Sequence, residues 1–177
     1  LNELKMMRIP LHPPNINKSF WQNSQGEGIM LGFSMVSGIS MPLFEAIITV
    51  RKHDGPFKDI YDLVSRTDFK FNEKILRNLI ISGALDEFEE NRKTMLQTLP
   101  DVLSTVSDGY HHDSFLSSLG FNIKKEYRYA DEMDGAEKIE GEKEALGFYI
   151  SAHPVLLKHE ELEFIPFSLI HHKRKYG

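Results

Sequence analysis

Two short glycine-centred turns constrain the fold of this 177-residue chain more than any other feature. They occupy residues 37–40 (SGIS) and 82–85 (SGAL), and each is flanked by segments with the apolar spacing of a helix. Glycine adopts backbone conformations that other residues avoid, which suits an abrupt change of direction between helices. The pattern predicts two helix–turn–helix units within residues 31–99, joined by a short helix near residues 59–64 into a compact five-helix unit.

Residues that favour helix ends mark the boundaries in this central unit. Ser40, Asp59, Asn72 and Asn91 each precede a run of helical apolar spacing and carry a short polar side chain that can cap a helix N-terminus. Pro100 is expected to kink or end the last helix, because proline has no backbone N–H to donate.

The N-terminal segment predicts a small β-hairpin on an otherwise mainly α fold. Residues 1–9 have the character of a helix end, which Pro10 stops. Two short apolar runs, 19–22 and 29–33, flank Gly26-Glu27-Gly28, and two such runs around a glycine turn are typical of a hairpin.

The C-terminal half is less regular. Residues 104–132 show little pattern and predict a long irregular or mobile connector. Helical spacing returns over residues 133–154, and residues 155–177 hold apolar pieces but no core of their own. The chain begins without Met and stops without a closing element, so we expect a piece of a longer protein.

Composition excludes several classes of function. The net charge of −5 argues against strong autonomous nucleic-acid binding, because free nucleic-acid binders are usually basic. The absence of cysteine excludes disulfides and thiolate metal sites and fits a reducing compartment. No run of about 18 apolar residues occurs, so we expect no membrane span.

The first turn has the features of a phosphate-backbone contact. A glycine turn before a helix leaves backbone N–H groups unpaired, and the helix dipole favours an anion there by about 0.3–1 kcal/mol. Such contacts carry no base information, and nearby Lys or Arg adds affinity by counterion release. The candidate backbone-binding residues are Ser37, Gly38, Ile39, Ser40, Arg51, Lys52, Arg92 and Lys93.

The two turns differ in the charges that follow them. Four acids, Asp86, Glu87, Glu89 and Glu90, follow the second turn and would repel phosphate, so we expect that turn mainly to hold the fold. The alternative for either turn is purely structural, since glycine at a helix–helix turn is commonly only a C-cap.

No catalytic or metal site is predicted. The run Asp131-Glu132 with Asp134 lies in the connector and has the character of a solvated charge cluster. The pairs His111-His112 and His171-His172 lack the spacing of metal ligands. Phosphate-loop, nucleophile-elbow and cysteine-nucleophile signatures are absent from the sequence. We therefore expect the chain to be inactive alone.

Five motifs in one order resemble the alpha subunits of bacterial DNA polymerase III, the C-family replicative polymerases. They are 12–19 (HPPNINKS), 29–39 (IMLGFSMVSGI), 55–63 (GPFKDIYDL), 79–92 (LIISGALDEFEENR) and 142–154 (EKEALGFYISAHP). The resemblance covers most of the chain except about residues 104–132. The continuation past the hairpins is similar to the form without a built-in exonuclease.

The resemblance implies a domain order. Residues 1–28 would hold the end of the fingers region and the start of the β-hairpin, and residues 29–103 a tandem helix-hairpin-helix domain. The connector 104–132 and the linking helix 133–154 would follow, and residues 155–177 would begin an OB-fold region.

The resemblance also implies partners and a location for the parent protein. It would bind double-stranded primer–template DNA, the remainder of the alpha subunit, the sliding clamp and other replisome subunits in the cytoplasm. Its Mg²⁺ would be held by palm carboxylates upstream of this chain, so no cofactor is expected here. Ser40 stands where the family often has a second glycine, and Met41-Pro42 replaces a small acidic helix start.

Three functions stay open at this stage. The first is a sequence-independent clamp on the duplex backbone. The second is a structural connector that positions the OB fold with little DNA contact, which the acidic balance favours. The third, an unrelated repair enzyme or helicase with a helix-hairpin-helix module, is disfavoured by the motifs that flank the hairpins.

Overall fold

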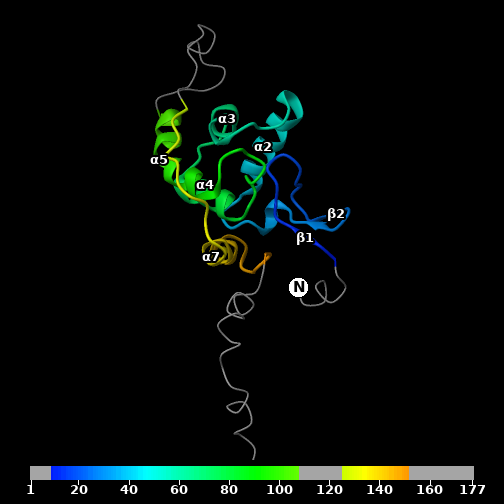
Figure 1. Ribbon diagram of the computed structural model, residues 1–177. Helices are drawn as coiled ribbons and strands as arrows, with labels where there is room; N and C mark the ends of the chain where they lie inside the picture. Colours follow the sequence, from blue (N-terminus) through cyan, green and yellow to red (C-terminus); the bar gives the residue numbers. More distant parts are fainter. Residues whose placement is uncertain (1–8, 108–124, 152–177) are drawn as a thin grey trace, which may run out of the picture.

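The computed structural model describes residues 9–107 and 125–151, which form five α-helices, one 3-10 helix and a three-stranded sheet (Figure 1). In chain order the elements are β1 (Leu11–His12), β2 (Ser24–Gln25), β3 (Ile29–Met30), η1 (Phe33–Met35), α2 (Met41–Asp54), α3 (Ile60–Arg66), α4 (Glu73–Ile81), α5 (Arg92–Ser107) and α7 (Gly135–Leu146). The predicted mainly α fold with a small β element near the N-terminus is confirmed. The first of the five predicted helices is only the single turn η1.

The sheet has the order β1-β3-β2, with β3 parallel to β1 and antiparallel to β2. The predicted hairpin is therefore present, but its first strand is Ser24–Gln25 and not residues 19–22. Residues 19–22 run beside residues 31–34 through single backbone hydrogen bonds, such as Phe33 N to Phe20 O at 2.9 Å. Gly32 allows this close approach, because a Cβ there would lie 2.4 Å from the Trp21 carbonyl oxygen.

Side-chain caps fix four helix starts where the sequence predicts them. Ser40, Asp59, Asn72 and Asn91 each accept a hydrogen bond from the backbone N–H three residues later, at 3.5, 2.8, 2.9 and 2.8 Å. Each such cap satisfies a donor that the helix itself leaves unpaired and contributes about 1 kcal/mol.

Helix α5 continues through Pro100 to Ser107, so the expectation that it would end there is wrong. Met95, Leu99 and Val102 lie on one face of α5, and all three are buried. This face packs against α3 and α4. Burial of one such side chain contributes about 1.5–3 kcal/mol, so three together outweigh the hydrogen bond that proline removes.

A single core joins the elements. Helix α4 packs against both α5 and α7, and α3 packs against α5 (Figure 1). Helix α2 contributes Leu43 and Ile47 to this core, and η1 contributes Phe33, all fully buried. The described part of the linking segment is therefore attached to the two hairpins and does not form a separate unit.

The connector is irregular but held in place where it is described. Residues 125–134 contain neither helix nor strand, and residues 108–124 lie outside the described residues. Arg128 N and Ala130 N donate to the hydroxyl oxygens of Thr98 and Thr94 at 3.0 Å each. Tyr61 adds a bond to the Glu126 carbonyl at 2.7 Å. Residues 125–132 are thus irregular, whereas residues 104–107, which the prediction counted in the connector, belong to α5.

Helix α7 is shorter than the predicted linking helix. It starts at a capping box between Asp134 and Glu137 and ends at Leu146, before Gly147. The chain then turns back, and the backbone N–H groups of Ile150 and Ser151 donate to the buried carboxylate of Glu142 at 2.8 and 3.0 Å. The predicted N-terminal helix end and the 155–177 segment lie outside the described residues.

Candidate nucleic-acid interface

The first turn presents its backbone to solvent at the start of α2. Gly38 has φ +82°, a left-handed conformation that costs residues with a Cβ roughly 1–2 kcal/mol. Ser37, Gly38 and Ser40 are exposed, whereas the Ile39 side chain is buried. Ile39 therefore anchors the turn in the core while its neighbours face outward.

Three N–H groups of this turn are available to a ligand. Within the described residues, the N–H groups of Gly38, Ser40 and Met41 donate to no protein acceptor. Pro42 has no N–H, and the Leu43 N–H is used by the Ser40 cap. Unpaired N–H groups at a helix N-terminus form a binding position for a phosphate oxygen.

Two of the four predicted turn residues serve the protein instead. The Ser37 N–H donates to the Ala145 carbonyl of α7 at 2.8 Å, and the Ile39 N–H to the Val36 carbonyl at 3.3 Å. Met41 is a donor that sequence reasoning missed, although its place directly after the Ser40 cap was a usable signal.

Helices α4 and α7 together hold the turn. Asn78 of α4 is 3% exposed, and its side-chain amide donates to the Ser37 carbonyl at 2.7 Å. The Ser37 peptide is thereby bonded to α4 on one side and to α7 on the other. Nothing in the sequence pattern indicates Asn78, because its partner is 41 residues away.

Arg51 and Arg92, two of the predicted cations, hold the fold. Arg51 donates to the carbonyls of Ile16 and Ser19 at 3.0 and 3.1 Å, and burial lowers its pKa. Arg92 is 6% exposed and makes a bidentate pair with Asp86 at 2.7 and 2.6 Å. Burial disfavours its charge, but the hydrogen bonds to Asp86 raise the pKa of Arg92 overall. Both guanidinium groups are therefore engaged by acceptors within the protein.

Lys52 and Lys93 lie at the surface. Lys93 pairs with Glu137 of α7 at 3.0 Å, whereas Lys52 is exposed and has no partner among the described residues. Lys52 follows Met41 by eleven residues on α2, so it lies roughly 17 Å along the helix from the first turn. The turn and Lys52 would therefore contact different phosphates.

The second turn is internal. Gly83 N and Ala84 N donate to carbonyls of α4 at 3.0 and 3.1 Å, and the Ala84 carbonyl accepts from Ile16 N at 2.8 Å. Residues 82–85 are buried, and turns and bends continue to residue 90 before α5 starts. The helix that follows the second turn starts after the Asn91 cap, as the sequence predicts. The N–H groups of Ser82, Gly83 and Ala84 all donate to acceptors within the protein.

The acids of the connector take structural positions. Asp134 caps α7, and Glu132 pairs with Lys138 at 3.2 Å. Within the described ranges, no three His, Cys, Asp or Glu side chains gather as a metal site would require. The predicted histidine pairs lie outside those ranges. No helix in the described part combines the length and apolar character needed to cross a membrane.

Comparison with known proteins places this geometry in a family. Residues 8–95 match the model of the helix-hairpin-helix motif. The DNA polymerase III subunit alpha of Staphylococcus epidermidis is 36% identical over 93% of this chain. Those of Staphylococcus aureus and Vibrio cholerae are 33% and 30% identical over 99% and 88% of it. The chain spans 16%, 16% and 14% of the lengths of these three relatives.

Proposed function

The chain belongs to the DNA polymerase III alpha-subunit family, and on this premise we propose that it is a non-catalytic module that binds the backbone of duplex DNA. One observation carries the proposal: three unpaired N–H groups stand at an exposed turn inside the region that matches the helix-hairpin-helix motif. Contacts from N–H groups to phosphate fix position and carry no base information, so binding is independent of sequence.

The proposed role is to hold primer–template DNA for template-directed synthesis by the whole subunit. The remainder of the alpha subunit is the direct partner, and the sliding clamp and other replisome subunits are partners through it. Two-metal polymerisation needs clustered carboxylates, and we propose that carboxylates in the remainder of the alpha subunit supply them.

A second candidate is supported by the charges. Arg51 and Arg92 are engaged inside the protein, Lys93 is paired, and the net charge is −5. These facts favour a connector that places the following region without touching DNA. The two candidates differ in whether a local change at the surface of α2 alters DNA affinity.

Replacing Lys52 by Glu is expected to weaken duplex binding by the full subunit about fivefold and to lower the slope of log affinity against log salt by about 1. The reason is the loss of one phosphate contact with its counterion release. Fluorescence anisotropy with two duplexes of unrelated sequence measures both quantities, and the two duplexes should give equal affinities.

Lys70→Glu provides the matched control, since Lys70 is another exposed lysine and lies on the α3–α4 loop. The backbone-binding proposal requires a larger effect at Lys52 than at Lys70. Equal, small effects at both positions would instead support the connector.

A further inference from the structure

We propose that Arg77 binds a DNA phosphate beside the first turn, in addition to the N–H groups of that turn. In the absence of DNA, the carboxylate of Glu144 pairs with the Arg77 guanidinium and so competes with phosphate. This inference rests on the proposed function and adds a residue and a mode of control to the same site. Arg77 lies on α4 and Glu144 on α7, and neither belongs to the hairpin that carries the turn.

The position of the pair follows from the two bonds that hold Ser37. Those bonds come from Asn78 of α4 and Ala145 of α7. The residue directly before Asn78 is Arg77, and the residue directly before Ala145 is Glu144. The Arg77–Glu144 pair therefore joins α4 to α7 one residue along the chain from each of the two bonds that hold the turn.

The chemistry of the pair suits an exchange of anions. Arg77 Nε and Nη2 lie 3.3 and 3.1 Å from the two oxygens of Glu144, a two-point contact that a phosphate can also accept. The two side chains are 44% and 54% exposed, so the pair is accessible. An exposed pair contributes little, about 0.2–1 kcal/mol, and an arriving phosphate can replace the carboxylate.

A further cation acts at the same place. Lys74 precedes Asn78 by one helical turn and is exposed. The hydrogen bond from Arg77 chiefly, and then the charges of Arg77 and Lys74, hold the pKa of Glu144 below its usual range. Positive charge from α4 therefore converges on Glu144, the residue directly before the Ala145 carbonyl that holds Ser37.

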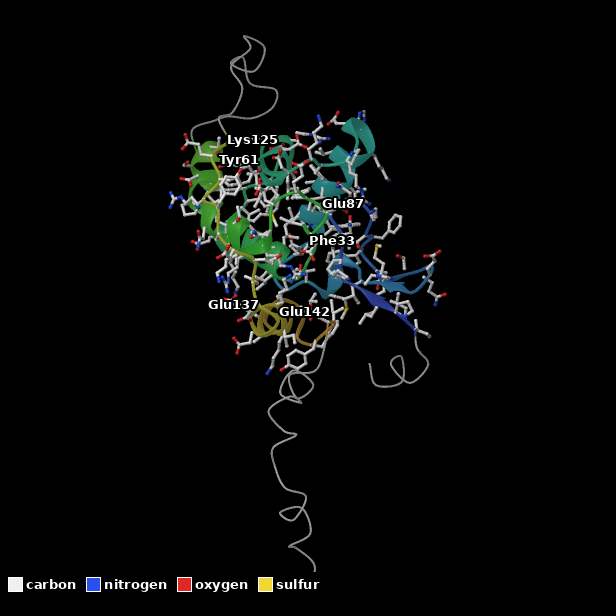
Figure 2. All side chains as sticks on the ribbon, viewed as in Figure 1. Phe33, Tyr61, Glu87, Lys125, Glu137 and Glu142 are labelled. Carbon is white, nitrogen blue, oxygen red and sulfur yellow. The ribbon has the colours of Figure 1, made fainter. Side chains whose placement is uncertain are left out.

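The chain contains a matched pair for comparison. Arg128 and Asp101 also form an exposed two-point arginine–carboxylate contact, at 2.6 and 2.8 Å. Both side chains lie close enough to Tyr61 to interact with it electrostatically. Figure 2 shows Tyr61 at the end of the molecule opposite Glu137 and Glu142 of α7. Asp101→Asn thus makes the same change of charge at the same kind of pair, far from the turn.

The test measures binding of a short blunt DNA duplex to the full-length alpha subunit across a range of salt concentrations. Glu144→Gln should tighten binding roughly two- to fivefold, the equivalent of an exposed ion pair, and Asp101→Asn should not. Arg77→Ala should weaken binding and lower the salt slope by about 0.9, and Glu144→Gln should give no gain in that background. The melting temperature of each variant is measured as well. A pair with a purely structural role would change the melting temperature without changing the slope of log affinity against log salt.

The outcomes separate this inference from the proposed function. If Glu144→Gln and Asp101→Asn have equal effects, or Arg77→Ala leaves the salt slope unchanged, Arg77 is not a phosphate ligand. In that case a loss of binding in Gly38→Glu would still support the backbone contact at the turn. If neither Gly38→Glu nor Arg77→Ala weakens binding, both the inference and the proposed function are overturned.

Discussion

Gly38→Glu in the full-length subunit is expected to shorten the DNA products of processive synthesis while leaving single-nucleotide insertion intact. The substitution has two effects at the turn. A side chain at φ +82° strains the backbone by roughly 1–2 kcal/mol, and the new carboxylate repels the phosphate that the N–H groups would hold. The lost phosphate contact and the new repulsion change the DNA-bound state, and we expect them together to lower duplex affinity about tenfold.

Gly55→Ala is the control for the backbone strain in Gly38→Glu. Gly55 also has φ +82°, and a Cβ there would meet no atom within 4 Å. It lies at the opposite end of α2, so alanine repeats the strain away from the turn and adds no carboxylate beside Lys52. Product-length assays on both variants measure the difference. Equal shortening by both variants, or none by either, would contradict a contact at the first turn.

Gly32→Ala is expected to lower the free energy of unfolding by about 3 kcal/mol. This is the largest effect that we predict for the addition of one methyl group. A Cβ at Gly32 would lie 2.4 Å from both the Trp21 oxygen and the Gln22 carbonyl carbon. These are backbone atoms, so the clash is relieved only by separating residues 21–22 from 31–34. That movement breaks the bonds that position η1, which leads into the first turn.

Gly26→Ala is the comparison for this clash. A Cβ at Gly26 would meet nothing within 4 Å, so its addition should change the free energy of unfolding by less than about 1 kcal/mol. Urea denaturation followed by circular dichroism measures both variants. Similar midpoints for the two would show that the approach of the two backbone segments is not tight.

Local features of the fold could be predicted from the sequence. The caps at Asp59 and Asn72 depend on a short polar side chain and the apolar spacing that follows it, and both signals lie within a few residues. The left-handed glycine at position 38 is local in the same sense. These signals placed the helix starts and the exposed turn correctly.

Features that depend on contacts between distant segments could not be predicted. Arg92 resembles a surface cation in the sequence, but packing of α4 against α5 buries it beside Asp86. Pro100 resembles a helix end, but the apolar face of α5 keeps the helix continuous. Asn78 has no special character until folding places the Ser37 carbonyl next to it. Whether a cation is free depends on partners elsewhere in the chain, so the pairing of Arg92 and Lys93 could not be seen in the sequence.

The central claim is that the N–H groups of the first turn contact the DNA backbone, and amide NMR spectra test it most directly. The ¹⁵N-labelled chain would be titrated with a short DNA duplex at low salt. We predict that the amide resonances of Gly38, Ser40 and Met41 shift most and return to their free positions as salt is added. Unchanged resonances for these three amides, with shifts confined to other parts of the described chain, would contradict the claim.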